Sequence, residues 1–180
     1  MQIFRNIKVS MRDGVKLSTN VFLPDGIGPW PVVLVRTAYN RNFVYDSSFP
    51  RSEMVLVVQD CRGRYASEGE YYPFVNETND GYDTLGWISS RPWCNGKIGM
   101  YGASYLAATQ FYTVISGSKK ISALNPQFMA EDCWKQAYFS NGAFSLGLTW
   151  SWLCFETNNK TSEASLMPAF NVGELLRTLP

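Results

Sequence analysis

One serine lies where a strand is expected to turn into a helix. The segment KIGMYGASYLAATQF, residues 97–111, begins like a buried strand, bends at Gly102-Ala103-Ser104 and continues with apolar residues at helical spacing. A serine held at such a bend can act as a nucleophile, and the N–H groups at the beginning of the helix can stabilise the negative charge that develops on a substrate. Strand and helix approach closely there, so small neighbours are needed, and Gly102, Ala103 and Ala107 meet that need.

The motif alone leaves two interpretations of Ser104. A G-x-S sequence is short enough to occur by chance, and Leu106 stands where the usual G-x-S-x-G pattern has its second glycine. Ser104 is therefore either a nucleophile or a serine in a turn before a helix. The chain contains no histidine, the residue that usually takes the proton from a catalytic serine.

Composition indicates a globular protein and excludes several classes of partner. The chain has 180 residues, of which 46% are hydrophobic and 17% charged, and this length can bury a good core. Its net charge is +1 with scattered basic residues, so we expect no nucleic-acid binding. The beginning, MQIFRNIKVSMRDG, lacks the apolar region of a secretion signal, and no apolar stretch is long enough to span a bilayer. We therefore expect no membrane association.

The four cysteines have no metal-binding pattern. They are not spaced as C-x-x-C pairs, and no histidine is present to complete a zinc site. We expect reduced, mostly buried thiols, no metal, no cofactor and a cytoplasmic location. The cysteines are Cys61, Cys94, Cys133 and Cys154.

The chain before Ser104 alternates strand and helix patterns. Residues 3–10 and 15–23 alternate apolar and polar side chains around Asp13-Gly14, which is typical of a β-hairpin. Near-continuous apolar runs follow, and such runs indicate parallel strands buried on both faces. The fold class is therefore α/β, with an antiparallel hairpin leading into a mostly parallel sheet. The expected elements are strands over 31–37, 54–60, 97–101 and 121–125, and a crossover helix over 77–89 with Tyr82, Leu85 and Ile88 on one face.

Three of these strands end in residues that could do chemistry. The carboxyl ends of parallel strands meet at one edge of a sheet, where ligand sites form. Tyr39, Asp60, Arg62 and Ser104 all follow or end such strands and are expected to gather at that edge. For Asp60 and Arg62 we expect a partly buried ion pair that shapes the loop rather than a direct chemical role.

The pattern changes at Ala130. We expect one unit over 1–129 and a second over 130–180, in which aromatic residues recur at helical spacing. The last residues, GELLRTLP, contain no closing helix, so the second unit is expected to be incomplete. Its aromatic residues are Trp134, Tyr138, Phe139, Phe144, Trp150, Trp152 and Phe155.

Several segments together resemble the cocaine esterase and X-Pro dipeptidyl-peptidase family of serine hydrolases. They occur in family order and cover nearly the whole chain. Ala38, Arg91 and Ala107 depart from the usual proline, glutamine and glycine of that family. The segments are MRDGVKLSTNVFLPDG, PVVLVRTAYNR, QDCRGRYASEGEY, NETNDGYDTLGWISSRPWCNG, the elbow stretch RPWCNGKIGMYGASYLAATQ and DCWKQAYFSNGAF.

The resemblance implies an α/β-hydrolase core with helices on both faces, truncated within a helical cap that begins at 130. Ser104 would be the acylated nucleophile, and the backbone N–H of Tyr105 and the hydroxyl of Tyr39 would form the oxyanion hole. The substrate would be a small ester or amide, or a short peptide. The family's triad acid and histidine lie after the cap, so residues 1–180 would be inactive alone.

Two alternatives remain from the sequence. The chain could be a non-catalytic scaffold or binding protein derived from this family. It could also be a small nucleotide-binding domain that uses Gly99 and Gly102 as a phosphate loop, although it lacks the G-x-G-x-x-G pattern. The sequence leaves the oligomeric state open, as it does the choice between ester, β-lactam-type amide and peptide substrates.

Overall fold

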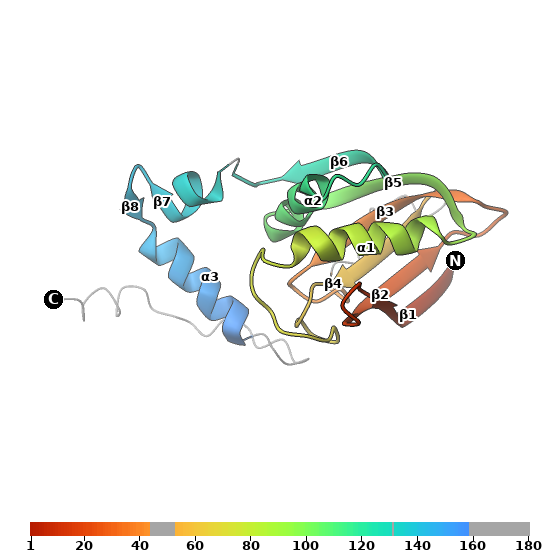
Figure 1. Ribbon diagram of the computed structural model, residues 1–180, viewed down its shortest axis with the longest axis horizontal. Helices are drawn as coiled ribbons and strands as arrows, with labels where there is room; N and C mark the ends of the chain where they lie inside the picture. The colour runs from red at the N-terminus through yellow and green to blue at the C-terminus, as the bar shows by residue number, and fades with distance from the viewer. Residues whose placement is uncertain (44–52, 131, 159–180) are drawn as a thin grey trace. The chain divides into compact units, whose positions relative to one another are not determined.

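The computed structural model describes residues 1–43, 53–130 and 132–158. The chain divides into two compact units, Met1–Met129 and Ala130–Pro180. Figure 1 shows the elements of each unit along the chain.

A mostly parallel sheet forms the first unit. The strands β1 (Gln2–Ser10), β2 (Lys16–Leu23), β3 (Trp30–Thr37), β4 (Val55–Asp60), β5 (Cys94–Ala103) and β6 (Ile121–Gln127) lie in the order β1-β2-β4-β3-β5-β6. β1 and β2 form an antiparallel hairpin, and β2 is antiparallel to β4. β3, β4, β5 and β6 are all parallel to one another. The predicted combination of an antiparallel hairpin and a parallel sheet is confirmed.

The continuous apolar runs have the burial that parallel strands require. All residues of β4 are buried. Side chains alternate between the faces of a strand, and β4 accordingly contributes to two separate clusters. Val55 and Val57 pack in a cluster with Leu85 of the helix α1 (Glu77–Ser89), whereas Leu56 and Val58 belong to another cluster.

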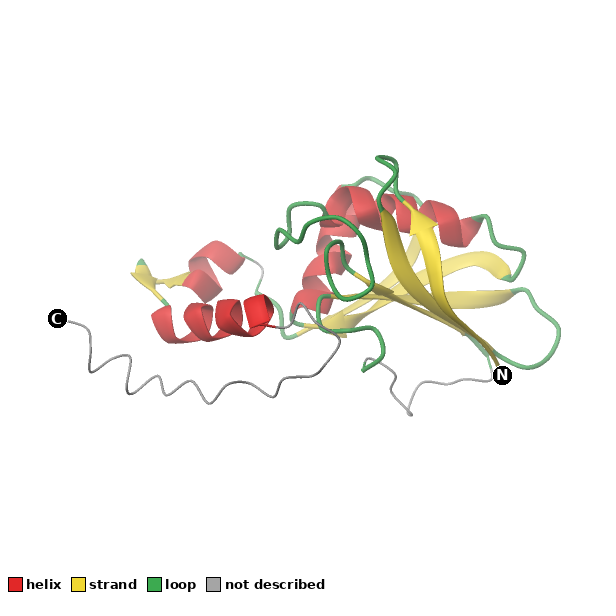
Figure 2. Cartoon of the chain, turned by 90° about the horizontal axis from the view of Figure 1, so that it is seen from below, coloured by secondary structure: helices red, strands yellow, loops and turns green. Residues whose placement is uncertain are grey.

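The two helices of the first unit lie on one face of the sheet. α1 packs against α2 (Tyr105–Ile115), and both lie on the same side of the twisted strands (Figure 2). The crossovers from β4 to β5 and from β5 to β6 run in the same direction across the sheet, and right-handed crossovers then place both helices on the same side. The expected helix on the other face would belong to the connection from β3 to β4, whose residues 44–52 lie outside the described part of the chain.

The buried face of α1 differs from the expected one at its beginning. Leu85 and Ile88 are buried as predicted, but Tyr82 is 42% exposed. Its ring lies 5.3 Å from the Arg12 guanidinium carbon instead of in the core. Glu77 and Asp80 are buried instead. Their carboxylates bind Arg36, which is fully buried, and Arg62, which is largely buried.

The aromatic spacing predicted a helical second unit, but its described part also contains two short strands. A π-helical turn, η1 (Trp134–Tyr138), leads into a short hairpin of β7 (Phe139–Ser140) and β8 (Ala143–Phe144), and α3 (Leu146–Asn158) follows. The hairpin forms because Asn141 and Gly142 both take positive φ, at 53° and 84°, as a two-residue turn of this type requires. The side chains of Trp134 and Phe155 lie outside the described part.

Most of the described cysteines are less buried than expected. Cys61, Cys94 and Cys133 are free thiols, but only Cys61 is buried, so the expectation of mostly buried thiols is wrong for the cysteines described. In the described residues, no helix combines the length and the apolar character that crossing a membrane needs.

Candidate active site

Ser104 lies in a strained backbone conformation between β5 and α2. Its φ of 56° and ψ of −123° fall outside the regions that a residue with a side chain normally occupies. The Ser104 N–H donates to the Gln127 carbonyl of β6 at 2.9 Å, and the Ser104 carbonyl accepts from the N–H groups of Ala107 and Ala108 at 2.9 and 3.0 Å. The residue itself is exposed. The neighbouring backbone therefore holds Ser104 from both sides and presents it to solvent.

Close packing between the end of β5 and the beginning of α2 explains why residue 102 is a glycine. Gly102 has a φ of 140°, and a Cβ there would lie 2.4 Å from the Cβ of Leu106. Leu106, the large residue that departs from the usual motif, thus occupies the space that Gly102 leaves empty. Ala107, the residue after Leu106, is fully buried.

Tyr39 reaches the same region from the neighbouring strand. It follows β3, which pairs with β5, and its ring centroid lies 6.2 Å from that of Tyr105 in an edge-to-face arrangement. The chain leaves β3 in one direction to form β4 and then returns past β3 to form β5. Tyr39 and Ser104 therefore lie at the point where the strand order reverses, which is where open α/β sheets bind ligands.

Asp60 and Arg62 do not pair with each other, contrary to the expectation from sequence. Asp60 forms a buried ion pair with the guanidinium of Arg41 and accepts the Arg41 backbone N–H at 2.7 Å. Burial raises the pKa of Asp60, although the bonds from Arg41 oppose the shift. Arg62 instead binds Asp80 at 2.6 Å and Asp13 at 2.7 Å. The two side chains separate because Asp60 ends β4 beside the loop after β3, whereas Arg62 faces α1 and the β1–β2 turn.

The side chain of Tyr105, the residue after Ser104, is buried and bound to Glu77. Its hydroxyl donates to Glu77 Oε1 at 2.7 Å and accepts the Phe74 N–H at 3.1 Å. The Phe74 ring stacks on it with centroids 4.9 Å apart. Burial and the negative charge of Glu77 raise the pKa of Tyr105 well above its ordinary value of 10.0. Tyr105 therefore remains a protonated hydrogen-bond donor.

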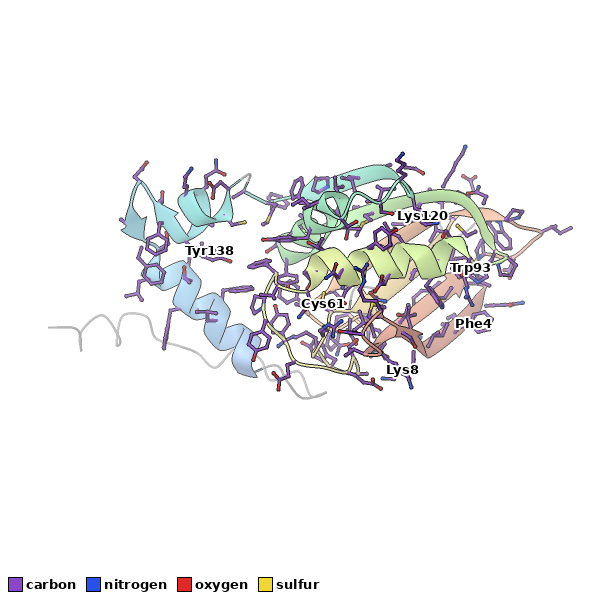
Figure 3. All side chains as sticks on the ribbon, in the orientation of Figure 1. Phe4, Lys8, Cys61, Trp93, Lys120 and Tyr138 are labelled. Carbon is purple, nitrogen blue, oxygen red and sulfur yellow. The ribbon has the colours of Figure 1, made fainter. Side chains whose placement is uncertain are left out.

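Glu77 joins this tyrosine to a network of buried polar groups. Arg36, fully buried on β3, binds Glu77 Oε2 at 2.7 Å and donates from Nε to Gln59 at 3.0 Å. Burial alone would lower the pKa of Arg36, but the negative charges of Glu77 and Asp80 raise it. Cys61 lies near the beginning of α1 (Figure 3), with Sγ 3.6 Å from Glu77 Oε2, and burial raises the pKa of its thiol. The network connects β3, α1 and the beginning of α2.

The sequence did not single out the charged residues that support this region. Charged side chains are seldom fully buried unless they are paired, and their partners come from distant parts of the chain. A signal was present for Glu77 and Asp80, because they lie eight residues before Leu85 and Ile88 respectively and so share the buried face of α1. These buried charged residues are Arg36, Arg41, Arg64, Glu77 and Asp80.

Known proteins resemble this chain in sequence. Residues 13–171 match the family described as X-Pro dipeptidyl-peptidase (S15 family). The cocaine esterase of Rhodococcus sp. (strain MB1 Bresler) is 38% identical over 156 residues, which cover 82% of this chain and 27% of that protein.

Solved structures resemble it in fold. An aminopeptidase from the marine sediment archaeon Thaumarchaeota archaeon superposes with a TM-score of 0.75 at 25% identity, covering 89% of this chain and 31% of that one. An α-amino-acid ester hydrolase superposes with a TM-score of 0.72 at 25% identity, covering 89% and 30%. The chain thus spans about a third or less of the length of these relatives. It has an α/β-hydrolase fold and belongs to the cocaine esterase and X-Pro dipeptidyl-peptidase (S15) family of serine hydrolases.

Proposed function

We propose that this chain supplies the nucleophile and the oxyanion donors of a serine hydrolase that acts on acyl esters, amides or short peptides. The observation that carries the proposal is the strained, exposed Ser104 between β5 and α2, beside the ring pair of Tyr39 and Tyr105. Strain of this kind persists only where the surrounding structure imposes it, and it clusters at functional sites.

In the proposed reaction Ser104 Oγ attacks the carbonyl carbon of the substrate and gives its proton to a general base. The C–O or C–N bond to the leaving group then breaks, the leaving group takes up the proton, and an acyl-enzyme forms that water later hydrolyses. The negative charge on the carbonyl oxygen is stabilised by the backbone N–H of Tyr105, the first residue of α2, and by the hydroxyl of Tyr39.

The general base is not a histidine of this sequence, because the sequence contains none. A serine is a weak nucleophile at neutral pH without a base. The matched segment is 27% of the cocaine esterase. We propose that the base and the acid that orients it lie outside these 180 residues. We further propose that 1–129 is part of the hydrolase core and that 130–180 begins a helical cap.

Turnover by the full-length protein, which would include the proposed base and acid outside these 180 residues, tests the proposal. The wild type and Ser104→Ala are compared on p-nitrophenyl butyrate and on an X-Pro p-nitroanilide. Hydrolysis that depends on Ser104 is expected with at least one of them, and the preferred one distinguishes an esterase from a peptidase. If neither shows turnover that depends on Ser104, the chain is a scaffold without this chemistry.

A further inference from the structure

The loop that carries Tyr39 is bound on both sides of that residue, by the last residue of β4 and by the loop that follows β4. The carbonyl of Ala38 accepts a hydrogen bond from Arg64 Nε at 2.9 Å. The backbone N–H of Arg41 donates to Asp60 Oδ1 at 2.7 Å. Tyr39 thus lies between two attachment points, one residue before it and the other two residues after it.

The groups that make these attachments are buried charges. Asp60 and Arg64 are fully buried and Arg41 nearly so. The Arg41 guanidinium pairs with Asp60 and also donates to the side-chain oxygens of Asn20 and Asn6. Buried charges cost free energy even when they are paired. An ordinary connection between two strands does not need them, so their presence here calls for a reason beyond closing the loop.

Arg64 is itself held in place. Its backbone N–H donates to the Cys61 carbonyl at 3.1 Å. Its guanidinium carbon lies 4.7 Å from the Tyr71 ring centroid and 5.3 Å from that of Tyr65. A fully buried side chain close to two rings has little freedom, so the position of its Nε, and with it that of the Ala38 carbonyl, is defined.

Hydrogen bonds within the loop complete the attachment. The Tyr39 N–H donates to Thr37 Oγ1 at 2.9 Å, and the Thr37 carbonyl accepts the Cys61 N–H at 2.8 Å. Asn40 takes a positive φ of 74°, and its side chain accepts the Asn42 N–H at 3.0 Å. The backbone on both sides of Tyr39 is therefore bound at nearly every residue.

We propose that Asp60 and Arg64 are positioning residues that hold the Tyr39 hydroxyl at the oxyanion; this rests on the function proposed above. A hydrogen-bond donor that is fixed before the reaction needs no reorganisation when charge develops on the substrate. Loss of either attachment lets the Tyr39 loop shift, and a shift of about 1 Å can cost on the order of a hundredfold in rate. The loss falls on kcat rather than KM, because this bond tightens in the transition state.

Arg62 provides a matched control in the same loop. It is also an arginine with ion-pair partners, but those partners are Asp13 of the β1–β2 turn and Asp80 of α1 instead of residues of the Tyr39 loop. Replacing it perturbs the same loop and another ion pair without touching an attachment point of Tyr39. A change that comes only from lost stability would appear in both Arg62→Lys and Arg64→Lys.

The test is a double-mutant cycle in the full-length protein. Arg64→Lys, Asp60→Asn and Arg62→Lys are each combined with wild-type Tyr39 and with Tyr39→Phe, and kcat and KM are measured for an ester substrate. With Tyr39 present, Arg64→Lys and Asp60→Asn should lower kcat by roughly ten- to a hundredfold and leave KM nearly unchanged. With Tyr39→Phe they should cost no more than about twofold, because the donor that they position is gone. Arg62→Lys should leave kcat nearly unchanged in both backgrounds.

Equal losses in both backgrounds would overturn the proposal, since the residues would then act on stability alone. Thr37→Val, which removes the acceptor of the Tyr39 N–H, goes through the same cycle if Asp60→Asn does not fold. Should Tyr39→Phe be harmless while Ser104→Ala abolishes turnover, the positioning proposal fails and the serine hydrolase stands. If Ser104→Ala is harmless, the proposed function fails. Amide hydrogen exchange then tests whether Asp60 holds the Arg41 N–H. Faster exchange at Arg41 in Asp60→Asn supports it, and unchanged exchange refutes it.

Discussion

Ser104 and Tyr105 are neighbours in the chain with opposite environments. Ser104 is exposed, whereas Tyr105 is buried and directs its hydroxyl to Glu77. A buried side chain on the first helical residue anchors the helix beginning, and the serine before it stays accessible. At the scale of single residues, the candidate site is therefore an exposed serine beside a buried, hydrogen-bonded tyrosine.

The Tyr39 hydroxyl should contribute to catalysis and not to substrate binding. Tyr39→Phe in the full-length protein keeps the ring and its contact with Tyr105. We expect kcat to fall by on the order of a hundred- to a thousandfold, the usual cost of losing one oxyanion donor. Steady-state kinetics on p-nitrophenyl butyrate measures this. An unchanged kcat would make Tyr39 a structural aromatic.

The burial of the Tyr105 hydroxyl beside the negative charge of Glu77 should make the stability of the chain fall at alkaline pH. Folding raises the pKa of Tyr105 above 10.0, so above that pH the unfolded chain loses the proton while the folded chain keeps it. The stabilisation is complete below pH 10.0 and declines above it by about 1.4 kcal/mol per pH unit.

Tyr105→Phe supplies the comparison for this effect. At neutral pH it should lower the free energy of unfolding by about 1.5–3 kcal/mol, the worth of a hydrogen bond to a charged group. Urea unfolding of both forms between about pH 8 and about pH 11 should show the difference between them shrinking at the alkaline end. A difference that stays constant over that range would argue against a shifted tyrosine.

The sequence predicted some residues of the site and not others, for a physical reason. Ser104 and Tyr39 could be placed because each follows a strand whose apolar run is local and continuous. The partners of Asp60 and Arg62 could not be assigned, since the Arg41 and Asp80 side chains reach them only through the tertiary fold. Charges paired across elements leave no periodic signal in a sequence.

At the scale of the elements, the packing of α1 on α2 depends on one glycine. A Cβ at Gly81 would lie 2.1 Å from Thr113 Oγ1 of α2, whereas a Cβ at Gly86 of the same helix would meet nothing within 4 Å. The sequence predicted the bounds of α1 correctly. It could not show that Gly81 is the glycine on which the packing depends, because that follows from both helices sharing one face.

The two glycines of α1 should respond oppositely to alanine. Gly81→Ala should destabilise the chain by about 1–3 kcal/mol through overpacking against α2. Gly86→Ala should stabilise it by about 0.5–1 kcal/mol, because alanine is the better helix former and has room there. Denaturant unfolding measures both. Equal effects of the same sign would contradict the close approach of the two helices.

At the scale of the whole molecule, the proposed nucleophile and both proposed oxyanion donors lie in the first unit, and the sequence contains no histidine to act as the base. The architecture of the first unit was predictable from alternating patterns along the chain. The hairpin of β7 and β8 was not foreseen, because the aromatic spacing there resembles that of a helix, although Asn141-Gly142 is a sequence typical of a tight turn.

Residues 1–180 alone should therefore show no triad-level hydrolysis. Losing serine-triad chemistry costs on the order of a millionfold in kcat, and an intact oxyanion hole retains only about a thousand- to ten-thousandfold over water. Turnover of p-nitrophenyl acetate by the purified chain is measured beside its Ser104→Ala variant. Ordinary enzymatic rates that Ser104→Ala abolishes would mean that another base is present within these residues.

The most direct test of the central claim, that Ser104 is the acylated nucleophile, is covalent labelling of the full-length protein with a fluorophosphonate. The probe forms a stable bond only with an activated serine, so its attachment site identifies the nucleophile without any choice of substrate. We expect mass spectrometry of the digested protein to place the label on Ser104, and Ser104→Ala to lose both the label and the esterase activity. A label on another residue, with Ser104→Ala still labelled and active, would contradict the account.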